Sequence, residues 1–167
     1  MTKRNVMISI LTSRLEVGIH LFEEGEDFAP NPLDFLPREM PEPTEMLVEG
    51  RLVTNADRVE LVYDESPLSG MMGSVTAIGF DRANPGLVTM MRSGTVFAAM
   101  SFEEGKRHIS VYDTPFSSFQ ICIRTLCVKN TLLTDGKITL EYLIEFHGAQ
   151  AEHCRMTIST RPAENLF

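Results

Sequence analysis

Apolar and polar side chains alternate along most of this chain, and this period of two constrains the fold more than any other feature of the sequence. No long stretch spaces its apolar residues as an amphipathic helix would. Short alternating segments separated by Gly, Asp and Pro are typical of an antiparallel meander. Because open sheet edges invite aggregation, we expect an all-β fold, a closed antiparallel meander barrel of about 8–10 strands with little helix. The expected strands are 5–11 (with a continuation to 21), 45–53, 58–65, 74–81, 86–92, 95–103, 106–114, 117–128, 137–147 and 151–160.

The chain has 167 residues, enough for one domain with its own apolar core, so residues 1–167 are treated as a single domain. Its formal net charge is −8, from 23 acidic and 15 basic residues. An acidic surface repels phosphate backbones and anionic lipids, and no run of Lys or Arg offsets it. We therefore expect no nucleic acid and no membrane as a partner.

Residues 22–45 hold most of the excess acidity and five of the nine prolines. Proline cannot donate to a sheet ladder and clustered carboxylates repel one another, so we expect an exposed acidic, Pro-rich loop within the barrel domain. It is interpreted either as a solvated loop or as a lid or partner-docking loop. In the second case its apolar contacts would be Phe28, Leu33, Phe35 and Leu36.

The three cysteines, Cys122, Cys127 and Cys154, are interpreted as buried small apolar side chains. Their odd number suits a reducing compartment, and the five-residue spacing of Cys122 and Cys127 in one strand points their side chains to opposite faces. Neither the cysteines nor the four histidines have the spacing of a metal site, so no metal and no cofactor are expected. The apolar run after Arg4 is too short for a signal peptide, and we expect a cytoplasmic protein.

Two connections near the C-terminus predict strand registers. Asp135-Gly136 is typical of a two-residue type I′ turn, which would pair Thr134 with Lys137, Cys127 with Ile144 and Thr125 with Phe146. A three-residue loop at 148–150 would pair Ile144 with Cys154, Tyr142 with Met156 and Leu140 with Ile158, and would bring Glu145 and His153 together outside. Turn chemistry and hydrophobic phase then agree on one inner face. Its members are Phe119, Ile121, Ile123, Thr125, Cys127, Ile138, Leu140, Tyr142, Ile144, Phe146, Cys154, Met156 and Ile158.

In the middle of the chain the two faces of the strands are harder to assign. A turn at Ser93-Gly94 would pair Met91 with Val96 and Leu87 with Met100, and a turn at Glu104-Gly105 would pair Met100 with Ile109. On hydrophobicity the inward face is then Leu87, Met91, Val96, Ala98, Met100, Phe102, Ile109 and Val111. The alternative is that the other face lines a polar cavity, with Arg92, His108 and Tyr112 converging on a ligand.

Several stretches taken together resemble the YwiB-like family, a bacterial domain of unknown function. They are 63–73 (Tyr-Asp-Glu-Ser-Pro-Leu-Ser-Gly-Met-Met-Gly), 91–94, 100–108, 112–116, 123–125 and 136–142, and the resemblance spans about residues 45–160. It implies a calycin-like (lipocalin-type) closed barrel in a bacterial, cytoplasmic protein. It implies no reaction, and fold alone does not imply function.

The candidate ligand-binding residues are polar side chains that alternation brings to strand ends or to the polar face. Glu65 follows Val59, Leu61 and Tyr63 in phase, so it should face inward and requires a cation, with Arg92 or Arg107 as candidates. These residues either seal the barrel as an ion pair or form a recognition site for a small molecule. The full candidate set is Glu65, Arg92, Arg107, His108, Tyr112 and Thr114, with Leu68, Met71 and Met72 as a mouth loop that plugs or gates the barrel.

The hypothesis we carry forward is a non-enzymatic barrel that binds a small apolar or amphipathic molecule through one open end. It predicts a cavity of roughly 300 Å³ or more. The alternative is a solid-cored interaction module that acts through its outer face or its acidic loop on a protein partner or a second copy. A third hypothesis is hydrolase chemistry assisted by His108, which would require a Ser, a Thr or a water beside it. No catalytic motif supports it, so no catalytic residue is assigned.

Overall fold

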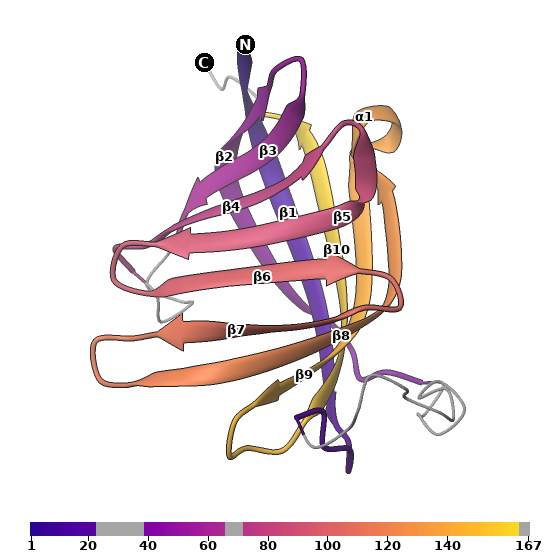
Figure 1. Cartoon of the computed structure of the whole chain (residues 1–167). Coiled ribbons are helices and arrows are strands. Elements are labelled where there is room, and N and C mark those ends of the chain that lie inside the picture. Colours follow the sequence, from indigo (N-terminus) through magenta and orange to yellow (C-terminus); the bar gives the residue numbers. More distant parts are fainter. Residues whose placement is uncertain (23–38, 66–71, 164–167) are drawn as a thin grey trace.

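Ten antiparallel strands form one closed barrel in the computed structural model, which describes residues 1–22, 39–65 and 72–163 (Figure 1). The strand order around the barrel is β1-β10-β9-β8-β7-β6-β5-β4-β3-β2, so neighbours in sequence are neighbours in space and β1 closes the ring against both β2 and β10. The predicted all-β meander barrel with little helix is confirmed. The elements are β1 (Thr2–Glu16), β2 (Thr44–Thr54), β3 (Arg58–Asp64), β4 (Val75–Asp81), β5 (Asn84–Ser93), β6 (Phe97–Glu103), β7 (Arg107–Asp113), β8 (Ser118–Thr131), α1 (Leu132–Asp135), β9 (Lys137–Phe146) and β10 (Glu152–Pro162).

The interior is dry and apolar over most of its length, as the alternation predicts. Ile121, Tyr142 and Ile144, on which that prediction depends most, are all buried. They belong to one core cluster, to which every strand except β7 contributes buried side chains. β7 contributes one partly buried side chain, that of Tyr112. Its fully buried members include Ile8, Leu61, Ile78, Ile138, Leu140 and Ile158.

The predicted type I′ turn at Asp135-Gly136 is wrong, because α1 occupies this connection. Gly136 ends the helix with a φ of 69°, its N–H donates to the carbonyl of Leu132 at 3.0 Å, and Thr131 rather than Thr134 pairs with Lys137. The helical turn buries Leu132 in the core, which a tight two-residue turn could not do.

A bulge between Thr125 and Cys127 shifts the β8–β9 register once more. Thr125 therefore pairs with Tyr142, not Phe146, and Cys127 pairs with Glu141, not Ile144. The predicted inner face survives up to Thr125, because the total shift there is an even number of residues. Cys127 lies on the other side of the bulge and is exposed, so the prediction that all three thiols are buried is wrong for this one.

The β9–β10 pairs are also displaced by an even number of residues. Cys154 pairs with Tyr142, and Met156 pairs with Leu140, because the ladder begins at the pair Ile144–Glu152, which centres the hairpin on Gly148 rather than on Ala149. The inner face is unchanged by this shift. The predicted outer pairs, however, are replaced.

Glu145 and His153 do not meet. The Nε2 atom of His153 lies 2.9 Å from a carboxylate oxygen of Glu141 instead. Glu145 accepts the backbone N–H groups of Leu21 and Phe22, at 3.2 Å each. Both outer-face carboxylates are thus used within the fold.

For β5 and β7 the hydrophobic assignment of the inner face is wrong. Arg92 pairs with Ala98 and Leu87 with Glu103, an odd shift that turns Val88 and Met90 inward and leaves Met91 exposed. Ala98 pairs with Tyr112, so Tyr112 faces inward, while Ile109 and Val111 are exposed. The prediction holds only for β6 and the residue before it, where Val96, Ala98, Met100 and Phe102 are buried.

The ladder between β6 and β7 is short. In the described chain these strands pair only at Phe97–Asp113 and Ala98–Tyr112. Beyond this point the turn after β6 bonds to β8, since the N–H of Gly105 donates to the carbonyl of Thr125 at 2.9 Å. β6 and β7 lie on the near wall in Figure 1 and are joined by a short turn on the side that carries α1.

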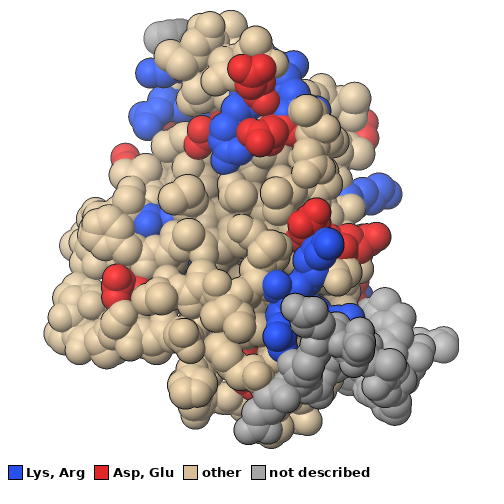
Figure 2. All heavy atoms as spheres, viewed as in Figure 1, with Lys and Arg blue, Asp and Glu red and all other residues tan. Residues whose placement is uncertain are grey.

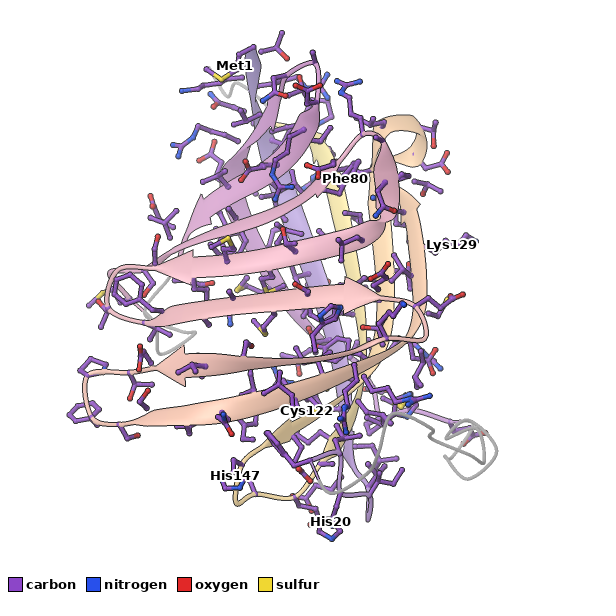
Figure 3. The ribbon with its side chains drawn as sticks, viewed as in Figure 1. Met1, His20, Phe80, Cys122, Lys129 and His147 are labelled. Atoms are coloured by element: carbon purple, nitrogen blue, oxygen red, sulfur yellow. The ribbon has the colours of Figure 1, made fainter. Side chains whose placement is uncertain are left out.

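Outside the barrel, residues 17–22 run across β8 and β9 as a strap that builds a second apolar cluster. β1 ends at Glu16, so the expected continuation of the strand to 21 is wrong. The strap is fixed by the two bonds to Glu145 and by Arg107, whose Nη1 donates to the carbonyl of Leu21 at 2.9 Å. Figure 3 shows His20, Cys122 and His147 in this region. The cluster consists of Val17, Leu21, Cys122, Leu143 and Ala151.

Glu145→Ala is expected to release this strap without unfolding the barrel. Losing the carboxylate leaves one buried and one partly buried N–H group without an acceptor, at a cost of about 2 kcal/mol, so thiol labelling of Cys122 beneath the strap should accelerate more than tenfold. The measurement is mass-resolved alkylation in a Cys127→Ser background, with Cys154 as the internal reference. Glu145→Gln keeps one acceptor and should fall in between. Equal acceleration at Cys122 and Cys154 would mean global unfolding instead.

Most of the predicted acidic loop lies outside the described residues, which exclude 23–38. Its end belongs to β2, which begins at Thr44. No helix of the described chain is long and apolar enough to cross a membrane.

Candidate functional site

A cavity of about 520 Å³ opens at the end of the barrel where the β5–β6 and β7–β8 loops lie. Strand alternation places its walls, because every second residue of β5, β6, β9 and β10 points into the interior. Figure 1 shows these two loops at the end of the barrel opposite α1. The lining residues are Arg14, Met90, Arg92, Thr95, Val96, Met100, Phe102, Tyr112, Thr114, Pro115, Phe116, Tyr142, Ile144, Phe146, Cys154 and Met156.

The deeper walls of the cavity are apolar. Met90, Met100 and Met156 line it from three strands, and the rings of Phe102 and Tyr142 lie 4.9 Å apart between them. Methionine side chains are flexible and polarizable, so they adapt to ligands of different shape. This part of the site can hold an apolar body but offers it no specific orientation.

Two aromatic rings, those of Tyr112 and Phe146, line one side of the cavity, and Phe119 packs against both. Tyr112 stacks on Phe119 with ring centroids 5.3 Å apart, and Phe146 meets both rings edge-on at 6.0 and 5.6 Å. Such offset and edge-on pairs are stabilising beyond their buried area. They hold β7, β8 and β9 together at the open end.

A buried ion pair lies at another wall. Glu65 is 5% exposed, and the Nε atom of Arg92 lies 3.4 Å from its Oε1 atom and 3.3 Å from the hydroxyl oxygen of Thr76. The hydroxyl of Thr76 donates to the same carboxylate oxygen at 2.5 Å. Burial, and next the charge of Glu65, raise the pKa of Tyr63 to about 12, so this phenol stays protonated at neutral pH.

Arg14 supplies a second cation at the opening. It lies on β1 opposite Cys154, and its side chain is 63% exposed. Burial raises the pKa of the Cys154 thiol to about 11, and burial also raises the pKa of the Tyr142 phenol beside it. Both groups are therefore neutral at physiological pH, and the thiol is a poor nucleophile.

The structure brings some of the predicted residues together and separates others. Arg92, Tyr112 and Thr114 line the cavity, and Glu65 lies directly behind Arg92. Arg107 does not reach the cavity, because it lies on the outside and bonds to the strap. In the mouth loop, Leu68 and Met71 fall outside the described residues, and Met72 is 63% exposed and does not line the cavity.

His108 also lies away from the cavity lining. Its Nε2 atom is 3.9 Å from a carboxylate oxygen of Glu103, and within the described chain this nitrogen is buried without a hydrogen-bond partner. No Ser or Thr hydroxyl among the described residues is bonded to it. The described residues also contain no group of three or more His, Cys, Asp or Glu side chains that could hold a metal ion.

Arg14 is the site residue that sequence reasoning missed. The expected first strand is 5–11 with a continuation to 21, and the expected pattern assigns Arg14 to neither face. Its position at an even spacing after Val6, Ile8 and Ile10 is the signal that would have found it.

Comparison with known proteins gives a family and a fold. Residues 37–158 match the model of a family described as "Domain of unknown function (DUF1934)". The structure is similar to the crystal structure of ywiB protein from Bacillus subtilis, with a TM-score of 0.64 and 16% identity over 95% of this chain and 93% of that one. At this identity the likeness concerns the fold alone. No curated protein matches the chain.

Proposed function

The chain belongs to the DUF1934 family, whose function is unknown, and we propose from the geometry of its own site that it is a non-enzymatic, small-molecule-binding barrel. The single observation that carries this proposal is the cavity of about 520 Å³ at one end of the barrel. Ligand sites are typically concave, of about 300–1,000 Å³, and apolar with a few convergent polar groups. The methionine and aromatic walls with Arg92, Tyr112 and Thr114 at the opening have this character.

The proposal includes a place of action. A barrel of the calycin-like (lipocalin-type) class in a reducing bacterial cytoplasm would suit three free cysteines, two of them buried. The similar structure comes from Bacillus subtilis, which supports the bacterial assignment.

Titration with a neutral solvatochromic dye, Nile red, tests the cavity. Met100→Trp fills the lumen and should weaken dye binding at least tenfold, because Met100 lines the cavity and is 7% exposed. Ala99→Trp is the matched control, since its side chain is exposed on the outer face of the same strand. It should leave the affinity unchanged. Circular dichroism checks that both variants fold.

A second candidate function is protein interaction through the outer face of β5, β6 and β7. Met91, Phe97, Ile109 and Val111 are each about half exposed there, from 49% to 56%. In Figure 2 the face over these strands is almost free of charged side chains, which gather at its margins. Exposed apolar patches of this kind mark interaction sites. Dye binding that falls in Ala99→Trp but not in Met100→Trp would favour this face over the cavity.

A further inference from the structure

We propose that the ligand is an amphipathic carboxylate, with its head group between Arg14 and Arg92 and its apolar body among Met90, Met100 and Met156. The inference rests on the proposed function and adds the chemical class of the molecule. It is carried by the distribution of charge around the cavity, by the way Arg92 is held, and by the state of the neutral polar groups.

The charge of the lining is opposite to that of the protein. The chain carries a net charge of −8, yet the described lining residues include two arginines and no Asp or Glu. The nearest buried carboxylate, Glu65, lies behind Arg92 rather than at the cavity surface. Arg14, Arg92 and Glu65 together leave one positive charge at the opening. A monoanion would neutralise it.

Arg92 is held in place by buried partners while it lines the cavity. Its Nε atom points to Glu65 and Thr76, which fix the plane of the guanidinium, and the side chain is 15% exposed. Its side chain also forms a hydrogen bond with the Tyr63 phenol, and it still lines the cavity. A guanidinium offers five donors in a fork that matches a carboxylate, and such charge-assisted bonds are strong when they are partly desolvated.

Arg14 lies across the opening without a strong partner. Its nearest described carboxylate is that of Glu152, at 4.0 Å and itself partly exposed, a distance and setting at which an ion pair contributes little. A ligand carboxylate would therefore gain a second cation without displacing a stable salt bridge. Beside Arg14, the Tyr142 phenol and the Cys154 thiol are neutral, so no anion of the lining opposes the head group.

Three probes that share a ten-carbon chain and differ in their head groups test the inference: decanoate, decanol and decyltrimethylammonium. The two ionic probes are used below their micellar concentrations and decanol below its solubility limit. Their affinities are measured by displacement of Nile red. Decanoate should bind about tenfold more tightly than decanol, and decyltrimethylammonium should bind most weakly. Arg14→Gln should reduce decanoate affinity several-fold and leave decanol unchanged.

Arg92 is tested in the paired variant Glu65→Gln/Arg92→Gln, because removing the arginine alone would leave a buried carboxylate uncompensated. This variant should also lose affinity for decanoate and keep it for decanol. Decanol bound as tightly as decanoate, or unequal affinities that neither variant changes, would overturn the carboxylate assignment while leaving a binding barrel. Failure of the dye and all three probes to bind would overturn the proposed function itself.

Discussion

Val88→Asp should destabilise the barrel by more than about 4 kcal/mol, whereas Met91→Asp on the same strand should change its stability by less than about 0.5 kcal/mol. Val88 is fully buried and Met91 is 54% exposed. An aspartate at position 88 would place a carboxylate in the apolar interior with no cation to pair with it. The measurement is guanidinium chloride unfolding of both variants, followed by circular dichroism.

Val88→Ala keeps the experiment quantitative if Val88→Asp does not fold. It should cost about 1.5–3 kcal/mol, because it removes buried apolar area without adding charge. A larger loss of stability in Met91→Asp than in Val88→Asp would mean that Met91, and not Val88, faces the interior, as hydrophobicity alone predicts for β5. The structural account of the cavity would then fail, since Arg92 would point outward.

Gly94→Ala should cost more than about 3 kcal/mol, against about 1–2 kcal/mol for Gly105→Ala. Both glycines have positive φ, 122° and 79°. A Cβ at position 94 would overlap the carbonyl oxygen of Gly73 and lie 3.0 Å from the Cα of Ser74, while a Cβ at position 105 meets nothing within 4 Å. The difference between the two variants therefore contains the backbone contact together with the larger dihedral strain at a φ of 122°.

Thermal unfolding of the two variants measures this difference, and dye binding measures its effect on the site. Thr95 and Val96, which follow Gly94, line the cavity, and the N–H of Val96 donates to the hydroxyl of Ser74 at 2.9 Å. Gly94→Ala should thus weaken dye binding as well as stability. Equal stability of Gly94→Ala and Gly105→Ala would show that the close approach of Gly94 to Gly73 and Ser74 is not needed for stability.

The sequence predicts the fold well because alternation decides only which face of the sheet a side chain lies on. A register error of an even number of residues leaves that face unchanged. The faces of β8, β9 and β10 are correct although the pairs around Tyr142 are displaced, since both shifts are even where they matter. In β5 and β7 the shifts are odd, and Met91 and Ile109 lie outside rather than inside. The length of the connecting loop decides whether the register shift is even or odd. A glycine at a turn does not by itself show how many residues the loop contains.

The site is predictable only in part, for a related reason. Glu65 is placed by the phase of Val59, Leu61 and Tyr63, which continues to the end of β3. Arg14 can also be placed by phase, since it follows Ile8 and Ile10 at an even spacing in β1. Arg107 cannot, because it shares the phase of Ile109 and Val111, which the odd shift in β7 turns outward. Which cation reaches the cavity is then decided by the closure of β1 against β10, a contact between the two ends of the chain that no local pattern records.

The short ladder between β6 and β7 has a consequence for what the lumen can accept. Between this ladder, at Phe97–Asp113 and Ala98–Tyr112, and the turn in which the N–H of Lys106 donates to the carbonyl of Glu103, the described strands β6 and β7 form no further pairs. The two strands can move apart between these two points without breaking a strand pair. The cavity can therefore widen at this point without loss of strand pairing, so the same barrel can accept ligands of different thickness.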